Sequence, residues 1–314
     1  MTAVALVFPG QGSQTEGMAR AWAGHPAATS WTQADEILGR DVSRLGLDAP
    51  ADELREPAKC QLALFVHHIV LLEAWRAAGG AEPVAVAGHS LGEYDALVAG
   101  GVLDFADGLR LVEARAERTQ QAADAAPGSM VACLGFDIDT VAGACQQSGA
   151  YVANDNAPGQ IVVAGSSEAL ARLTERLSGG DEAAAGAARG KVLPLNVGAA
   201  YHSPHMDAAV EPFGQSLDAA AFADANVPVV ANVDAQPHTT AGEWPGLLRR
   251  QLTAPVRWRE TVTTLAGLGV AEVVELGASP VLTGLVKRTD RSLGRRTVSL
   301  PDDLPGPPVS GAGA

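Results

Sequence analysis

The chain has 314 residues, a length that suits one large domain plus a smaller one. Because 47% of the residues are hydrophobic and only 4% are aromatic, the core must be built mainly from Ala, Val and Leu. A net charge of −14 argues against a general nucleic-acid binder, and no run of about 18 uncharged apolar residues is present to span a membrane.

The first third of the chain alternates apolar runs with helical patterns. Residues 4–8 form a short apolar run that ends at a Pro-Gly pair, which predicts a buried strand followed by a loop. Residues 61–78 have helical periodicity. A second apolar run at 84–89 predicts another buried strand, and Ser90 and a helical segment follow it directly. Asp104 is predicted to cap the N-terminus of the next helix.

The rhythm changes between residues 128 and 196. A strand, a helix, two strands, a helix and a last strand are predicted there, at residues 130–136, 139–149, 150–155, 160–165, 167–178 and 191–196. This order is that of a split βαβ, ferredoxin-like unit. Residues 178–190 are predicted to be a low-complexity loop within it.

The first pattern then resumes, with strands predicted at 227–233 and 271–276. We therefore expect an α/β fold in which a large domain in two segments carries a small inserted domain, followed by a Pro- and Gly-rich disordered tail. The predicted boundaries are residues 1–127 and 197–300 for the large domain, 128–196 for the insert and 301–314 for the tail.

The sequence from Gly88 to Gly92, GHSLG, fits the G-x-S-x-G pattern between a predicted strand and a predicted helix. That is the context in which this pattern forms a sharp turn that exposes its serine at a helix N-terminus. Free backbone amides and the helix dipole there stabilise a developing oxyanion. Ser90 is therefore the candidate nucleophile, and an ordinary serine N-cap is the alternative.

Serine is a weak nucleophile at neutral pH and needs a base. Among the seven histidines, His202 stands out because it follows a predicted strand, where catalytic loops are common. His89 is expected to point away from Ser90. His202 and His205 have metal-ligand spacing but no third ligand, and the three cysteines have no metal spacing, so we expect no metal site. An apolar N-terminus without a basic region, together with unpaired cysteines, fits a cytoplasmic protein.

Several signatures stand in order along the chain. They are residues 8–14 (FPGQGSQ), 88–94 (GHSLGEY) and 201–204 (YHSP), with further matches at 112–115, 156–160, 250–252 and 281–285. Together they resemble the malonyl-CoA:acyl carrier protein transacylases, a family that includes the enzyme of bacterial fatty-acid synthesis and the acyltransferases of polyketide synthases. The resemblance implies an α/β-hydrolase-like large domain with an inserted ferredoxin-like domain.

The resemblance also implies the roles of site residues. Ser90 would be the nucleophile and His202 its base, and the backbone amides of Gln11 and Leu91 would form the oxyanion hole. The backbone carbonyl of Gln251 would orient His202, giving a Ser-His dyad without a carboxylate. A coenzyme A thioester is then a substrate, and no permanently bound cofactor is expected.

Arg115 lies where the family has an arginine that binds the malonyl carboxylate. A guanidinium presents parallel N–H donors that match a carboxylate at two points. The same cation would lose its partner when a neutral acyl group binds, which penalises the wrong substrate. Arg118 is expected to lie on a neighbouring helix face, and a surface role for Arg115 is the alternative.

The segment that sets acyl selectivity in the family aligns with residues 199–202, AAYH. Malonyl-selective polyketide enzymes tend to have His-Ala-Phe-His there, and methylmalonyl enzymes Tyr-Ala-Ser-His. Ala200 and Tyr201 are therefore the candidate selectivity residues. Since Tyr201 is large like Phe, it should crowd a substituent on the malonyl α-carbon, and we expect malonyl, with a substituted malonyl group as the alternative.

The expected reaction is transfer of malonyl from coenzyme A, through acyl-Ser90, to the phosphopantetheine thiol of an acyl carrier protein. A role in polyketide rather than fatty-acid synthesis is favoured, and a monomer is expected. Basic residues outnumber acidic ones between Arg249 and Arg296, so the stretch 287–296 and Met206 are candidate contacts for an acidic carrier. The alternatives are an acyl-thioester hydrolase or proofreading enzyme of the same fold, a transferase for a longer carrier-bound acyl chain, and a non-catalytic scaffold.

Overall fold

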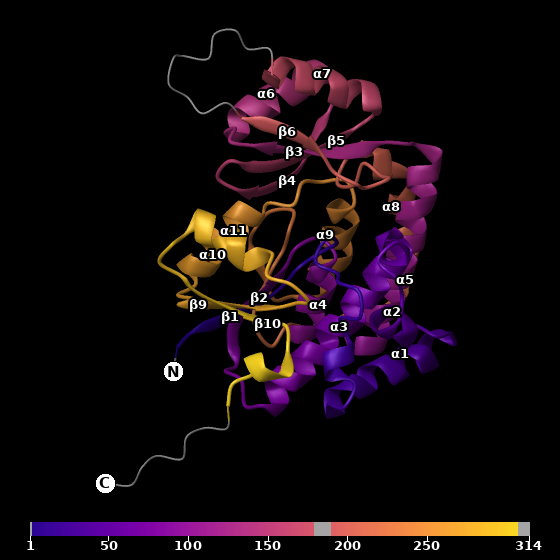
Figure 1. The fold of residues 1–314 in the computed structure, drawn as a ribbon, viewed down its shortest axis with the longest axis vertical. Coiled ribbons are helices and arrows are strands. Elements are labelled where there is room, and N and C mark those ends of the chain that lie inside the picture. The colour runs from indigo at the N-terminus through magenta and orange to yellow at the C-terminus, as the bar shows by residue number, and fades with distance from the viewer. Residues whose placement is uncertain (1, 179–189, 307–314) are drawn as a thin grey trace.

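The computed structural model describes residues 2–178 and 190–306. It is a mixed α/β structure built on two sheets, one of six strands and one of four. Figure 1 shows the four-stranded sheet and its two helices at one end of the molecule, above the larger sheet. No helix in the described ranges is long and apolar enough to cross a membrane.

The larger sheet has the order β10-β9-β1-β2-β7-β8 and is parallel except for β8, which pairs antiparallel with β7. Its strands are β1 (Val4–Phe8), β2 (Pro83–Gly88), β7 (Val229–Val230), β8 (Pro237–His238), β9 (Glu272–Leu276) and β10 (Gly294–Val298). All five residues of β1 are buried, as expected for a central parallel strand that is covered on both faces.

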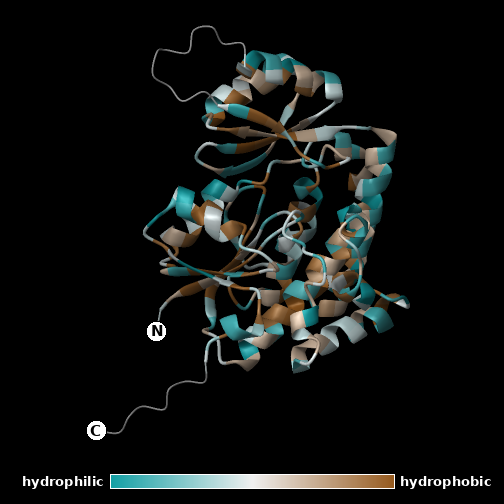
Figure 2. Cartoon of the chain, in the orientation of Figure 1, coloured by the Kyte–Doolittle hydropathy of each residue, from teal (hydrophilic) through white to brown (hydrophobic). Residues whose placement is uncertain are grey.

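Helices cover both faces of this sheet, and β1 shows how the two cores divide. Leu6 and Phe8 belong to the core on one face, while Ala5 and Val7 belong to the core on the other, because successive side chains of a strand point to opposite faces. The helices of the first core are α1 (Thr29–Leu38), α2 (Ser43–Leu47), α3 (Pro57–Ala77), α4 (Gly92–Ala99), α5 (Phe105–Ala125), α8 (Asp207–Ala219) and α9 (Trp244–Gln251). Those of the second are α10 (Trp258–Gly267) and α11 (Leu282–Thr289). Figure 2 shows hydrophobic colour both on strands of this sheet and on helices of these layers.

The smaller sheet is antiparallel with the order β4-β5-β3-β6. Its strands are β3 (Ser129–Leu134), β4 (Tyr151–Ala157), β5 (Gln160–Gly165) and β6 (Lys191–Pro194), and its helices are α6 (Ile138–Ser148) and α7 (Ser167–Ser178). The succession of strands and helices is the one that the sequence predicts for this stretch. Most of the predicted low-complexity loop, residues 179–189, lies outside the described residues.

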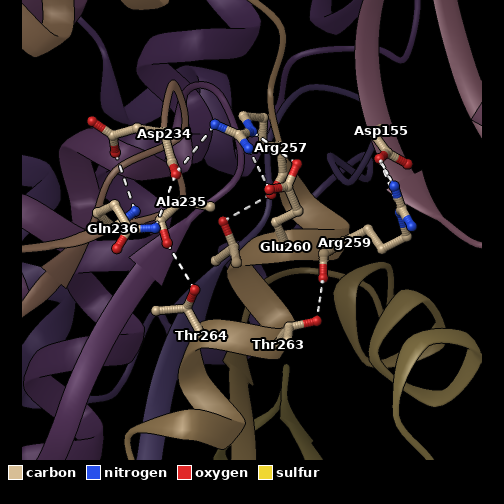
Figure 3. A network of polar contacts seen from close by, with 10 residues as sticks. Asp155, Asp234, Ala235, Gln236, Arg257, Arg259, Glu260, Thr263 and Thr264 are labelled. Atoms are coloured by element: carbon tan, nitrogen blue, oxygen red, sulfur yellow. Dashed lines mark hydrogen bonds and ion pairs between the residues drawn. The ribbon is translucent and has the colours of Figure 1, made fainter.

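Strand β4 joins the smaller sheet to the larger part of the chain. Asp155 N donates to Val256 O at 2.9 Å, and Val256 N donates to Ala153 O at 2.9 Å. The guanidinium of Arg259 adds two hydrogen bonds to the carboxylate of Asp155, at 2.9 and 2.7 Å (Figure 3). These contacts fix the seam between the two sheets, at which the candidate site lies.

Two predicted strands are shorter than expected. The apolar run 227–233 forms only Val229–Val230, because the chain turns after Ala231 and Ala235 takes a left-handed φ of 55°. Thr264 Oγ1 holds that turn by donating to Ala235 O at 2.8 Å (Figure 3). The run 191–196 is a strand only as far as Pro194.

The prediction of a disordered tail is wrong for its first residues. Pro301–Asp303 form a short 3-10 helix, and the carboxylate of Asp303 accepts from the backbone amides of Ser299 and Leu300 at 2.9 and 2.8 Å. Leu304 packs against the main core. The rest of the predicted tail, residues 307–314, lies outside the described residues.

Candidate active site

Ser90 occupies a sharp turn between strand β2 and helix α4. Its φ is +54°, a left-handed conformation that is strained for a residue with a side chain. The flanking glycines allow this turn: a Cβ on Gly88 would lie 1.8 Å from Gly92 O, and a Cβ on Gly92 would lie 2.1 Å from Phe8 O. The GHSLG pattern is therefore required by close backbone packing, and it presents Ser90 at the start of α4.

The side chains of Ser90 and His202 meet across 112 positions of sequence. Ser90 Oγ lies 2.7 Å from His202 Nε2, and His202 Nδ1 lies 2.8 Å from the backbone oxygen of Gln251. Because a carbonyl only accepts, Nδ1 carries the proton and Nε2 is free to accept from the serine hydroxyl. Burial, assisted by the positive charge of Arg115, lowers the pKa of His202 to about 3, so this imidazole is neutral near pH 7.

The backbone amides of Gln11 and Leu91 border the same space. Both residues line the cavity beside Ser90, and within the described ranges neither amide donates to a protein acceptor. The loop after β1 approaches the turn closely, since a Cβ on Gly10 would lie 2.6 Å from His89 O. His89 itself points elsewhere, with Nε2 at 2.8 Å from Asn156 Oδ1.

Arg115 reaches the site from helix α5 and is only 3% exposed. Its Nη2 donates to Ser90 Oγ at 3.1 Å and to Gln251 Oε1 at 3.3 Å, and its Nη1 donates to Gln61 Oε1. The guanidinium also lies over the ring of Tyr94, 5.7 Å from its centroid. The surface alternative for Arg115 is therefore excluded. Every one of these partners is neutral, so the cation has no direct counter-ion among the described residues.

Three buried polar residues that sequence reasoning missed complete this arrangement. Asn232 Oδ1 accepts from Ser90 N at 2.7 Å, Glu93 contacts both Asn232 and Gln251, and Gln61 holds one arm of Arg115. Burial raises the pKa of Glu93 to about 7 against the opposing effect of its hydrogen bonds and of Arg115. The local signals are a polar side chain inside an apolar run, at Asn232 and Gln61, and the place of Glu93 in the GHSLGEY signature.

A cavity of about 270 Å³ opens in front of Ser90, between the smaller sheet and helix α11. Its walls combine apolar side chains of both parts with the amides of Asn154, Asn156 and Gln160. Glu275 fixes the α11 wall, because its carboxylate accepts from the backbone amides of residues 281, 282 and 283 at 2.8 to 2.9 Å. Such a mixed lining suits a ligand with an apolar chain and amide groups.

The two candidate selectivity residues are placed differently. Tyr201 lines the cavity, and its buried hydroxyl has no hydrogen-bond partner among the described residues. Ala200 does not line it: this side chain is fully buried against Met130, Ala153 and neighbours on the smaller sheet. Only Tyr201 of the pair therefore faces the cavity.

The prediction that Met206 contacts a carrier is wrong, because its side chain is fully buried in the main core. Arg288, Arg291 and Arg295 of the predicted basic stretch are exposed. His205 contacts the backbone oxygen of Ala126 at 3.2 Å. In the described ranges, no group of three or more His, Cys, Asp or Glu side chains could hold a metal ion.

Comparison with known proteins places this site in a family. Residues 5–304 match the acyl transferase domain. The malonyl CoA-acyl carrier protein transacylase of Escherichia coli is 42% identical over 294 residues, covering 92% of this chain and 93% of the relative. A polyketide biosynthesis malonyl CoA-acyl carrier protein transacylase of Bacillus velezensis is 35% identical, covering 91% and 96%.

The fold agrees with this relationship. A malonyl-transacylase solved in complex with its type II PKS acyl-carrier protein superposes with a TM-score of 0.90 at 36% identity, covering 96% of this chain and 97% of the other. The chain therefore belongs to the malonyl CoA-acyl carrier protein transacylase family of acyl transferases.

Proposed function

We propose that this protein transfers a malonyl group from coenzyme A to the phosphopantetheine thiol of an acyl carrier protein, through an ester on Ser90. The observation that carries the proposal is the meeting of three side chains in one cavity. They are a serine on a strained turn, a neutral imidazole 2.7 Å away and a buried arginine that has no counter-ion in the described part of the chain. The relatives act as malonyl transacylases by name, which supports the same acyl group here.

In the first half-reaction, His202 Nε2 takes the proton of Ser90 as its oxygen attacks the thioester carbon. The resulting oxyanion accepts hydrogen bonds from the amides of Gln11 and Leu91. The carbon–sulfur bond then breaks, and the coenzyme A sulfur leaves with the proton that His202 holds. Malonyl-Ser90 remains, with its free carboxylate bound to Arg115.

The second half-reaction reverses these steps with another thiol. The pantetheine thiol of the carrier gives its proton to His202 and attacks the Ser90 ester. When the tetrahedral intermediate collapses, Ser90 leaves and recovers the proton from His202. Both thiols end a phosphopantetheine arm, so one cavity with amide and apolar walls serves both.

Selectivity for malonyl follows from Arg115 and Tyr201. A dicarboxylic acyl group supplies the anion that the buried guanidinium lacks, whereas acetyl leaves the cation unpaired. The ring of Tyr201 limits the space for a substituent at the malonyl α-carbon. The proposed selectivity residue is thus Tyr201, with Ala200 in the core behind it.

We propose further that the large part is an α/β-hydrolase-like domain made of residues 1–127 and 197–300, with a ferredoxin-like domain, residues 128–196, inserted. Two observations support this division: every strand of the four-stranded sheet lies inside the inserted segment, and the sheet order β4-β5-β3-β6 is antiparallel. A polyketide role stays a prediction, since one relative is named for polyketide biosynthesis and the other is named for no pathway. A cytoplasmic location stays a prediction as well.

The test is intact-protein mass spectrometry after exposure to a panel of acyl-CoAs. We expect the wild-type protein to gain the mass of one malonyl group, and the Ser90→Ala variant to gain none. Coenzyme A release should then depend on holo-carrier. Equal release without carrier would show a hydrolase, and an adduct formed only by longer acyl groups would show a different transferase.

A further inference from the structure

Glu93 lies in the first turn of α4, three residues after Ser90, and is only 1% exposed. Its two carboxylate oxygens each accept a hydrogen bond from a different part of the chain. Oε1 accepts from the backbone amide of Asn232 at 2.8 Å, and Oε2 accepts from Gln251 Nε2 at 2.6 Å. The mechanism proposed above gives this buried carboxylate no role.

The first partner, Asn232, holds both sides of the turn that carries the nucleophile. Its Oδ1 accepts from Ser90 N at 2.7 Å, and its Nδ2 donates to Gly88 O at 2.6 Å. By fixing the backbone of Asn232, Glu93 fixes the amide that supports the strained φ of Ser90.

The second partner, Gln251, touches all three members of the site. Its backbone oxygen lies 2.8 Å from His202 Nδ1. Its side-chain Nε2 also donates to Ser90 O at 2.8 Å, and its Oε1 accepts from Arg115 Nη2 at 3.3 Å. Through Gln251, Glu93 is therefore connected to the nucleophile Ser90, the base His202 and the cation Arg115.

The chemistry of these contacts requires an acceptor at both oxygens of residue 93. A glutamine there would place its NH₂ group against the NH₂ group of Gln251 or against the amide of Asn232. If the Gln251 amide turned over to relieve this, its NH₂ would face the guanidinium of Arg115, where only an acceptor fits. The carboxylate thus fixes the orientation of the Gln251 side chain.

We propose that Glu93 is the positioning residue of this active site: through Asn232 and Gln251 it sets the distance between Ser90 and His202 and keeps an acceptor facing Arg115. The inference rests on the proposed function. Since its action is indirect, its loss should slow the chemistry of the dyad more than it weakens acyl-CoA binding.

The experiment compares Glu93→Gln with Asp95→Asn, a matched control on the same helix. Asp95 is also fully buried, and its carboxylate contacts His68 at 3.0 Å rather than any residue of the site. Both variants remove a buried carboxylate and both should lower the melting temperature. The readout is the rate at which a serine-directed phosphonate labels Ser90, together with kcat and KM for malonyl-CoA.

We expect Glu93→Gln to lower the labelling rate and kcat on the order of ten- to a hundredfold, the size of effect that changing a hydrogen-bond partner of a metal ligand has, with little change in KM. Asp95→Asn should label at the wild-type rate. A folded Glu93→Gln protein that labels as fast as wild type overturns the inference, as does an equal loss in both variants.

If Glu93→Gln does not fold, Glu93→Asp takes its place. The side chain is one methylene shorter and cannot reach both donors, so the same loss of labelling is expected, and wild-type labelling again overturns the inference. Labelling needs no acyl donor. A wild-type protein that labels but does not load malonyl would therefore contradict the proposed function and still decide the role of Glu93.

Discussion

Replacing Arg115 by Ala separates binding of the malonyl carboxylate from the chemistry that all acyl groups share. Removing one partner of a buried ion pair costs about 3 to 5 kcal/mol. The malonyl carboxylate would lie beside Ser90, which is partly exposed, so the ion pair would be only partly removed from water. We therefore take the lower value, about 3 kcal/mol, which is a loss of roughly 150-fold in kcat/KM for malonyl-CoA. With acetyl-CoA, the substitution removes only the hydrogen bond from Arg115 to Ser90 Oγ. That bond is worth about 1 kcal/mol, so kcat/KM for acetyl-CoA should fall roughly fivefold.

The expected result is therefore a fall of at least about 30-fold in the preference for malonyl over acetyl, measured as initial rates of acyl-enzyme formation with each donor. Arg118→Ala is the control: this arginine lies on the same helix and donates to Gln121 at 3.0 Å, so its loss should leave the preference unchanged. If Arg115→Ala slowed both donors equally, the guanidinium would serve the dyad alone and the account of selectivity would be wrong.

Three further predictions concern the base, the turn and the carrier. Since burial lowers the pKa of His202 to about 3, its neutral form persists as the pH falls. Phosphonate labelling of Ser90 in the Glu93→Gln variant, which lacks the carboxyl with a pKa of about 7 at position 93, should therefore stay constant from about pH 8 to about pH 5. A midpoint near 6.5 would contradict this. Gly92→Ala places a Cβ 2.1 Å from a backbone oxygen and should lower the free energy of unfolding in urea by about 1 to 3 kcal/mol or more, whereas Gly246→Ala, with open space around it, should not. Replacing Lys287 and Arg288 by Glu should slow transfer from malonyl-enzyme to holo-carrier at low salt, with the rates converging at high salt.

The parts of the fold that the sequence predicts are those with a local physical signal. Strand β1 covers the same five residues as the apolar run 4–8, because a strand buried on both faces must be continuously apolar. Asp104 accepts from Asp107 N at 2.7 Å, as an N-cap residue of α5 should. The turn at Ser90 was recognisable because its glycines stand where a Cβ would meet backbone atoms.

The contacts that sequence reasoning missed join residues that are far apart in the chain. Asn232 lies within an apolar run that predicts a strand through residue 233, yet it leaves the sheet to bond Ser90 and Glu93. A polar side chain inside an apolar run marks Asn232 as unusual but does not identify its partners, which are about 140 residues away. Ala200 shows a different limit of prediction from sequence. A family motif assigns the same role to adjacent residues, although only Tyr201 of the pair faces the cavity.

The charges of the site explain why a carbonyl, and not a carboxylate, orients His202. A carboxylate in the place of Gln251 O would lie near Arg115 and would neutralise the cation that the malonyl carboxylate needs. It would also raise the pKa of the imidazole, so that a larger fraction would already be protonated and unable to take the Ser90 proton. The carbonyl fixes the tautomer at 2.8 Å without adding charge. The carboxylate of Glu93 bonds to the side chain of Gln251 rather than to His202 or Arg115. It can therefore order the site and still leave the guanidinium free for the substrate.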